Sequence, residues 1–152
     1  MGKVRYIYCD SNVFLAYFKG EEGRVEIVES LIDEVRGEKE LTLLSSLLSV
    51  TEVAHTATLT SRSVSDLEAI EALDSFWSNT SIVELSDFHV VLARRARALV
   101  RKHRGLDPRD PIHLATALQS NASELLTYDR DLLKLNDDYE FEICEPYLRR
   151  LI

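Results

Sequence analysis

Short runs of bulky apolar residues alternate along the chain with segments in which apolar residues recur every three or four positions. The first run, residues 4–9, is nearly all bulky, as in a strand that is buried on both faces. The runs that we expect to form strands are residues 4–9, 41–44, 81–85, 124–128 and 139–144. Strands of this kind are typical of a parallel sheet with helices on both faces.

The segments between the runs have the spacing of amphipathic helices, and residues 22–37 show it most clearly. The expected helices are residues 13–18, 22–37, 50–59, one opened by Ser63 and Ser65 that carries Leu67, Ile70, Leu73 and Phe76 toward the core, one capped by Ser86 and Asp87 that stops at Gly105, one begun by Asp110 and Pro111, and residues 129–135. Alternating strands and helices imply right-handed crossovers. The predicted fold class is therefore α/β, a three-layer α/β/α sandwich with a mostly parallel central sheet, in a single domain over residues 1–152.

The composition is that of an ordinary globular protein, with 45% hydrophobic and 29% charged residues. No window approaches the roughly 20 apolar residues of a membrane span, and the first apolar stretch is too short for a signal peptide. Cys9 and Cys144 give neither a disulfide framework nor a zinc spacing. We therefore expect a cytoplasmic protein with no membrane partner.

The net charge of −8 argues against a protein that coats nucleic acid. A local basic stripe nevertheless lies near the middle of the chain, with candidate RNA contacts at Arg94, Arg97, Arg101 and Arg104. Their spacing places them on one helix face that can meet phosphates. A solvated face with cations near a helix C-terminus explains the stripe equally well. Arg109 is nearer the acids described next and is a further candidate contact.

Four acids stand where strands are expected to end or helices to begin: Asp10, Glu52, Asp110 and Asp129. Helix capping explains each one taken alone, because Asp is a favoured cap and Ser49 with Glu52 matches the capping box. In a parallel sheet, however, such places converge on one edge. The four acids together therefore predict a carboxylate site.

Carboxylates crowded into one volume repel each other, by about 4 kcal/mol for two charges about 4 Å apart at an effective dielectric near 20. Hard divalent cations remove that repulsion, since Mg²⁺ and Mn²⁺ prefer oxygen ligands and keep several waters. One or two such ions can activate water and hold the oxygens of a phosphodiester. Hydrolysis of a phosphodiester bond is thus the chemistry that the acids favour.

Four segments in order, residues 8–12, 46–53, 106–117 and 125–131, give the chain a resemblance to the PIN-domain nucleases. Within that family the chain is similar to the VapC-type toxins of toxin–antitoxin pairs. Family members commonly have a small residue such as Ala where this chain has Pro111, a difference that suits a helix start. The resemblance covers nearly the whole chain and implies a PIN-like fold.

The resemblance also implies a site and an activity. Asp10, Glu52, Asp110 and Asp129 would ligate one or two Mg²⁺ or Mn²⁺ ions in an endoribonuclease site, with Asn12 and Thr127 as supporting polar groups. Asp131, two residues after Asp129, is a further supporting residue that can share or take its role. Products would carry 5′-phosphate and 3′-hydroxyl ends.

The implied partners are an RNA substrate, an antitoxin protein and a second copy of the chain in a homodimer. Two other functions stay open. One is a PIN-like RNA-processing nuclease outside a toxin pair, and the other is a non-catalytic RNA-binding or interaction module whose acids only cap helices or hold a structural ion.

Two further patterns suggest different chemistry. His55 and His113 each follow an acid by three residues, as in the Glu-x-x-His motif of di-iron helical bundles. Strong strand signals argue against a bundle, and a plain packed or surface histidine is favoured at both positions. Asp10 after a buried strand also resembles the aspartate nucleophile of haloacid dehalogenase phosphatases, but Asn12 stands where that class normally has a second Asp.

Overall fold

The computed structural model describes residues 2–60 and 66–149. The elements follow one another as β1 (Arg5–Cys9), α1 (Ser11–Phe18), α2 (Val25–Gly37), β2 (Leu41–Ser46), α3 (Leu48–Thr60), α4 (Asp66–Ser78), β3 (Val83–Ser86), α5 (Val90–Lys102), α6 (Asp110–Gln119), β4 (Glu124–Leu126), α7 (Arg130–Leu133), the 3₁₀ turn η1 (Asn136–Asp138) and β5 (Glu142–Cys144). Each of the five expected strands is present, so the reading of the apolar runs is confirmed. None of the helices in these residues is both long and apolar enough to cross a membrane.

The five strands form one sheet in the order β3-β2-β1-β4-β5, and each neighbouring pair is parallel. β1 lies at the centre, with Tyr8 beside Leu44 of β2 on one side and Leu125 of β4 on the other. The order reverses at β1, because the chain moves outward through β2 and β3 and then returns to the far side of β1. Such a switch point leaves a crevice at the carboxyl ends of the strands.

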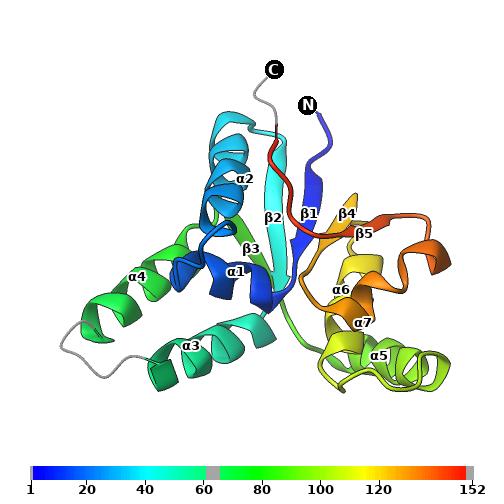
Figure 1. Ribbon diagram of the computed structural model, residues 1–152. Helices are drawn as coiled ribbons and strands as arrows, with labels where there is room; N and C mark the ends of the chain where they lie inside the picture. Colours follow the sequence, from blue (N-terminus) through cyan, green and yellow to red (C-terminus); the bar gives the residue numbers. More distant parts are fainter. Residues whose placement is uncertain (1, 61–65, 150–152) are drawn as a thin grey trace.

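Helices cover both faces of the sheet, so the predicted three-layer α/β/α sandwich is confirmed (Figure 1). One face packs against α1, α2 and α4 through a cluster that includes Phe14, Leu31 and Leu43. The other face packs against α6 and α7 through a second cluster around Leu114 and Leu125. α5 lies on the outer side of α6 and buries Leu92 and Ala96 against it.

Several element boundaries differ from the sequence expectation. α5 begins at Val90, where the His89 ring accepts a hydrogen bond from the amide of Leu92, and not behind Ser86 and Asp87. It ends at Lys102, so Arg104 lies in the turn that follows rather than on the helix. The expectation that Ser63 and Ser65 open α4 falls outside the described residues.

The expected core residues of α4 are also only partly correct. Leu73 is buried and Phe76 packs against the main cluster, as predicted, but Ile70 is exposed. α4 covers the β3 edge of the sheet, so only the part of its surface that faces β3 and α3 can be buried. The side chain of Leu67 is not among those that the structure describes.

The last described residues run back over the sheet beside α2. Arg149 forms ion pairs with Glu34 of α2, at 3.1 Å between Nε and Oε2, and with Glu124 at the start of β4. The Tyr147 hydroxyl donates to the same Glu124 carboxylate at 3.0 Å. These contacts hold the C-terminal segment at the edge of the sheet where the strands begin (Figure 1).

Candidate functional site

The predicted acids come from four different elements. Asp10 follows β1 and caps α1 by accepting a hydrogen bond from the amide of Ser11 at 2.7 Å. Asp129 lies shortly after β4 and caps α7 by accepting from the amide of Asp131 at 2.9 Å. Glu52 lies near the start of α3, and Asp110 is the first residue of α6. The capping role expected for Asp10 and Asp129 is therefore present, and it does not prevent their carboxylates from facing the crevice.

Asp110 does not have the capping role that its sequence suggested. Arg109 occupies the cap position of α6 without a side-chain hydrogen bond to the helix, and Asp110 with Pro111 already lies in the first turn. Its buried carboxyl group instead shares a hydrogen bond with Asp129. Burial first, and then the charges of Asp129 and Asp10, raise the pKa of Asp110 from 3.8 to about 7. These three carboxylates therefore interact electrostatically, as the sequence predicted.

Asp10 is held on both of its oxygens. Its Oδ2 accepts a hydrogen bond from the Thr127 hydroxyl at 2.8 Å and from the Asn12 amide at 3.2 Å. Asn12 also donates to the Thr127 hydroxyl and accepts from the amide of Tyr128. The amide of Asp129 donates to the same Thr127 hydroxyl at 3.0 Å. Asn12 and Thr127 thus tie the end of β1 to the end of β4 and orient Asp10.

His113 completes the site, and the sequence analysis did not assign it a role there. Its ring is almost fully buried, with Nε2 2.9 Å from Oε1 of Glu52 and 3.4 Å from Oδ1 of Asp10. On the other side, Nδ1 lies 2.6 Å from the buried Tyr8 hydroxyl, which accepts a hydrogen bond from the amide of Ser46. Burial lowers the pKa of His113, but the nearby Asp10 and Glu52 carboxylates outweigh burial and raise it. His113 therefore joins the sheet interior to two of the acids.

The one-turn spacing between Asp110 and His113 was the sequence signal for this arrangement, because residues three apart share a helix face. The same spacing matches the Glu-x-x-His motif of di-iron helical bundles, an architecture that the parallel sheet excludes. The side chain of His55, the other histidine in that reading, lies outside the described residues.

Glu52 and Arg109 mark the opening of the site. The guanidinium of Arg109 lies 3.6 Å from Oε2 of Glu52 and also binds Asp107, at 2.9 Å between Nε and Oδ1. Arg109 is otherwise exposed, so its charge faces solvent beside the acids. The expected capping box is not formed as predicted, because Ser49 lies inside α3 and its hydroxyl pairs with Ser45 at 2.8 Å.

Asp131 is placed differently from the other acids. Its backbone amide binds Asp129, but its exposed carboxylate faces Lys134, at 3.7 Å between Oδ1 and Nζ. In this geometry Asp131 supports Asp129 through the α7 cap, while its own side chain belongs to the surface next to α7.

The chemistry of the site fits a hard divalent cation. Asp10, Asp110 and Asp129 offer carboxylate oxygens, and a bound cation would offset the burial and the neighbouring charges that raise the pKa of Asp110. Within the described residues, three possible ligand atoms lie within 4.8 Å of one another only at Glu124, Glu142 and Cys144. The four predicted acids are therefore spaced more widely than the ligands of a bound ion. The group of Glu124, Glu142 and Cys144 lies under the C-terminal segment, where Arg149 already compensates Glu124.

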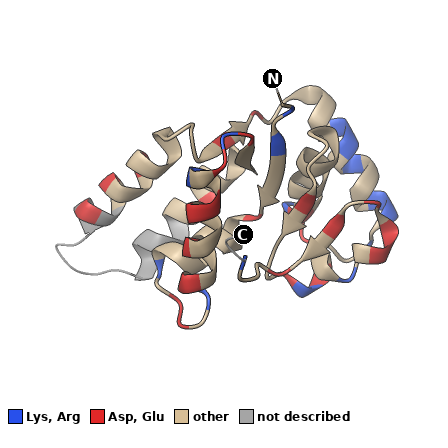
Figure 2. Cartoon of the chain, turned by 90° about the horizontal axis from the view of Figure 1, so that it is seen from above, with Lys and Arg blue, Asp and Glu red and all other residues tan. Residues whose placement is uncertain are grey.

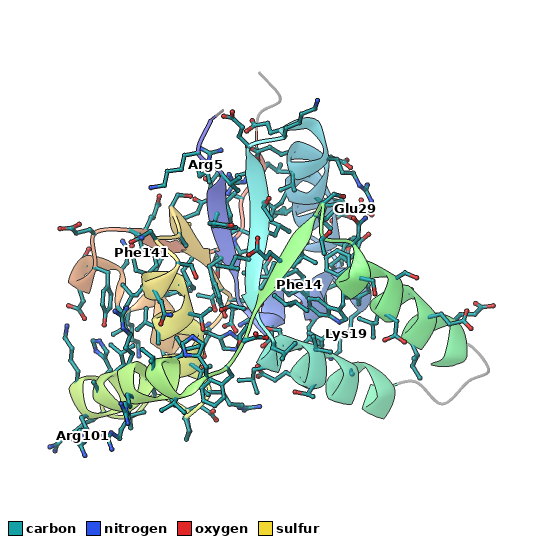
Figure 3. The ribbon with its side chains drawn as sticks, turned by 180° about the vertical axis from the view of Figure 1, so that it is seen from behind. Arg5, Phe14, Lys19, Glu29, Arg101 and Phe141 are labelled. Carbon is teal, nitrogen blue, oxygen red and sulfur yellow. The ribbon has the colours of Figure 1, made fainter. Side chains whose placement is uncertain are left out.

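The basic stripe lies on the surface, as its spacing predicted. Figure 2 shows Lys and Arg gathered along α5, and Figure 3 shows Arg101 extending from that helix into solvent. In the described part of the chain, no ion pair involves the exposed residues Arg94, Arg95, Arg97, Arg101, Lys102 and Arg104. Their charge is therefore available to an anionic partner.

Comparison with known proteins agrees with this geometry. Residues 7–138 match the family model of the PIN domain, and the chain belongs to that family. This confirms the resemblance that the four sequence segments carried. No curated protein sequence is significantly similar to the chain.

Solved structures share the fold at low sequence identity. A chain of a toxin–antitoxin complex from Klebsiella pneumoniae has a TM-score of 0.62 and 19% identity, covering 94% of this chain and 99% of that one. VapC20 from Mycobacterium tuberculosis, a toxin that cleaves the sarcin–ricin loop, has a TM-score of 0.64 and 14% identity, with 82% and 91% covered. VapBC2 from Rickettsia felis, bound to a DNA fragment of its promoter, has a TM-score of 0.61 and 17% identity, with 91% and 96% covered.

Proposed function

We propose that this protein is a metal-dependent endoribonuclease that hydrolyses RNA phosphodiester bonds, and that it is the toxin of a toxin–antitoxin pair. The observation that carries the proposal is the meeting of Asp10, Asp110 and Asp129 at the carboxyl edge of a PIN-type sheet, with the pKa of Asp110 raised to about 7. A carboxyl group held in this state is costly unless a cation binds beside it. Helix capping alone does not require three carboxylates to lie this close together.

Asp10, Glu52, Asp110 and Asp129 would hold Mg²⁺ or Mn²⁺, as one or two ions. A bound ion of this kind activates water and stabilises negative charge on phosphate oxygens. The chain itself supplies orientation: Thr127 and Asn12 hold Asp10, and His113 holds Glu52. The exposed guanidinium of Arg109, beside Glu52, is placed to contact a substrate phosphate.

Cleavage assays test the nuclease proposal. Purified protein is incubated with structured RNA in Mn²⁺, Mg²⁺ or EDTA, beside Asp10→Asn, Asp110→Asn and the matched surface control Asp137→Asn. We expect metal-dependent cleavage that leaves 5′-phosphate ends, that both site variants lose by at least about 100-fold, and that the control retains. Cleavage that survives both substitutions, or RNA binding with no cleavage in any metal, would contradict the proposal and favour a non-catalytic module.

The toxin role is supported by the relatives, which include toxins and toxin–antitoxin complexes. We expect expression of the chain in the bacterial cytoplasm to arrest growth of the cell. Co-expression of an adjacently encoded antitoxin should relieve the arrest. Asp110→Asn should be harmless alone while it still binds the antitoxin. A chain that cleaves RNA but never arrests growth would favour an RNA-processing nuclease outside a toxin pair.

A homodimer is proposed on the exposed apolar surface at the start of α5. Phe88, Val90 and Val91 are each more than half exposed, at 51%, 66% and 54%. Exposed apolar residues this close together favour contact with another protein surface. Light scattering after size-exclusion chromatography should give twice the monomer mass for the wild type. The Val91→Glu variant should have the mass of one monomer. A monomeric wild-type protein at micromolar concentration would contradict this part of the proposal.

A further inference from the structure

A pocket of about 370 Å³ lies between the C-terminal end of α5 and the segment after α7. Its walls are residues 102–106 on one side, and Asp131, Lys134 and Leu135 on the other. The first wall ends at Leu106, four residues before Asp110, and the second begins two residues after Asp129. Because Asp110 and Asp129 share a hydrogen bond, both walls are anchored at the acid site. The pocket therefore stands next to the site at which we expect a phosphodiester to react.

The charge of this pocket is opposite to that of the protein. Its lining contains the cations Lys102, Arg104 and Lys134 against the single carboxylate of Asp131. Lys102 and Arg104 form no ion pair within the described residues. The chain as a whole has a net charge of −8, so a cationic hollow beside its acids is not a consequence of composition.

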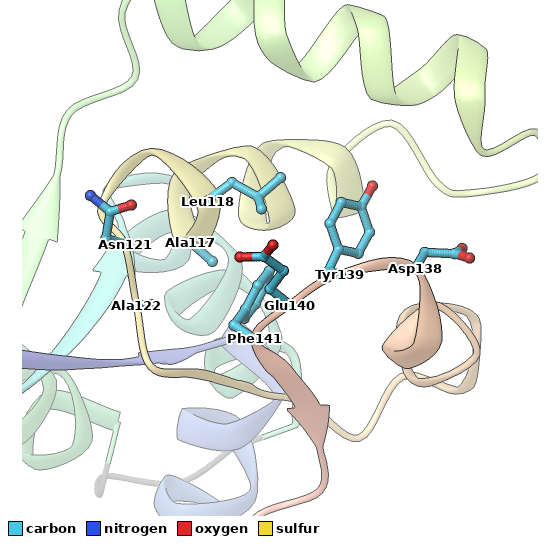
Figure 4. A pocket seen from close by; sticks show the side chains of 8 residues that line it. All are labelled: Ala117, Leu118, Asn121, Ala122, Asp138, Tyr139, Glu140 and Phe141. Atoms are coloured by element: carbon cyan, nitrogen blue, oxygen red, sulfur yellow. The ribbon is translucent and has the colours of Figure 1, made fainter.

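The two other pockets described lack this character. The pocket in Figure 4, at the other end of α6, is lined by Asp138 and Glu140 and has no basic residue. The third contains Glu29 and Asp33 against Arg36. Among the pockets described, cations therefore outnumber carboxylates only in the one that borders the acid site.

The pocket is also held in shape by contacts outside it. Nε2 of His103 lies 2.5 Å from the Tyr139 hydroxyl, and Nζ of Lys102 lies 5.2 Å from the centre of the same ring. Gly105 has φ of +97°, a conformation that other residues rarely adopt, and it turns the chain from α5 back toward Asp110. These contacts fix the end of α5, which forms one wall of the pocket.

We propose that this pocket binds a backbone phosphate of the RNA strand next to the scissile one, through Lys102, Arg104 and Lys134. The bound strand continues from the pocket along the exposed face of α5, past Arg101 and Arg97. Contacts to phosphates position a strand without reading its sequence, so the pocket sets where the strand enters the acid site rather than which bases are cut. The proposal rests on the nuclease function above, since it names the path of that enzyme's substrate.

Binding of a fluorescein-labelled single-stranded RNA by anisotropy tests the proposal, in an Asp110→Asn background that prevents cleavage. The test variant is Lys102→Gln, Arg104→Gln and Lys134→Gln together. The matched control is Lys3→Gln, Lys19→Gln and Lys39→Gln, which makes the same change in net charge at exposed cations elsewhere. Circular dichroism melting confirms that both triple variants are folded.

We expect the test variant to weaken binding at least about 10-fold at 0.1 M salt and the control less than about 2-fold. The slope of log K against log salt should fall by about 0.7, since one phosphate contact on a single strand contributes about that much. In the otherwise wild-type protein, the test variant should raise KM and leave kcat nearly unchanged. The same binding assay is repeated with RNAs shortened stepwise from one side of the cleavage site. Below a defined length the strand no longer reaches the pocket, so the proteins with and without the three substitutions should bind it equally.

Equal effects of the two triple variants, or no effect of either, would overturn the pocket as a phosphate site. The nuclease proposal survives that outcome if the wild-type protein still cleaves RNA with Mn²⁺. If the wild-type protein neither cleaves nor binds RNA, the proposed function fails and this inference fails with it.

Discussion

The Asp110→Asn substitution should stabilise the metal-free protein, because it removes a carboxylate that the fold holds at a cost. In the folded chain the pKa of Asp110 is about 7, and in the unfolded chain it returns to the ordinary 3.8. Between these values the folded state keeps a proton that the unfolded state loses. The stability that this proton contributes is fully present below about pH 3.8 and is lost as the pH rises through about 7.

The size of the effect follows from the same two values. Their difference corresponds to about 4 kcal/mol at pH 8, where both states are ionised. Local rearrangement relieves part of this cost, so we expect the amide to recover about 2 kcal/mol. For a chain of this length, that is a rise in Tm of about 4 to 8 °C. At pH 5 only about a third of the gain should remain, since Asp110 is then still protonated in the folded protein.

Thermal unfolding followed by circular dichroism at pH 5 and pH 8 measures this effect, with EDTA present and Asp137→Asn as the surface control. Saturating Mn²⁺ should reverse the order of stability, because the wild type gains about 2.7 kcal/mol at 100 times the dissociation constant and the variant gains less. A variant that is no more stable than the wild type at pH 8 in EDTA would refute the reasoning. So would a gain of equal size at pH 5.

Three other outcomes follow from the geometry. The apparent affinity for Mn²⁺ should rise about tenfold per pH unit between pH 5 and 7 and then level off, since the ion must displace the Asp110 proton. Calorimetry that detects no proton release on Mn²⁺ binding at pH 6 would contradict this. His113→Ala should lower the free energy of unfolding, measured in urea, by about 2 to 4 kcal/mol, because it removes the ring that contacts the Tyr8 hydroxyl and two carboxylates. A loss below about 1 kcal/mol would show that the site does not depend on the ring. Arg149→Ala should lower the free energy of unfolding by about 3 kcal/mol, because it breaks two largely buried ion pairs, and it should leave RNA cleavage unchanged. Lost cleavage in a folded variant would show that the C-terminal segment reaches the acid site.

The strands were predictable because a buried parallel strand has a local signature, a short run of bulky residues closed by a polar one. Residues 5–9 and 124–126 show this signature before the acids that follow them. Helix ends were less predictable, because they depend on single hydrogen bonds. The amide of Leu92 donates its hydrogen bond to the ring of His89, a residue that is not a common cap, so the start of α5 lies elsewhere than the sequence predicts.

The acids of the site could be inferred from where they stand along the chain, but the histidine between them could not. Tyr8 and Glu52, the partners of His113, are 105 and 61 residues away in sequence. No local pattern encodes contacts over such separations. The cationic pocket has no local sequence signal for the same reason, since Lys134 lines one pocket with Lys102 and Arg104 only when the end of α7 folds beside the end of α5.

The two ends of the described chain leave the molecule from one side, and this decides how the protein can be handled. Arg5 begins the central strand, and Arg149 binds Glu124 at the start of the neighbouring strand. The acids stand at the opposite ends of these strands, about 15 Å away at the rise of a five-residue strand. A purification tag, a fluorophore or an attachment to a sensor surface at either end therefore leaves the acid edge open to a large ligand.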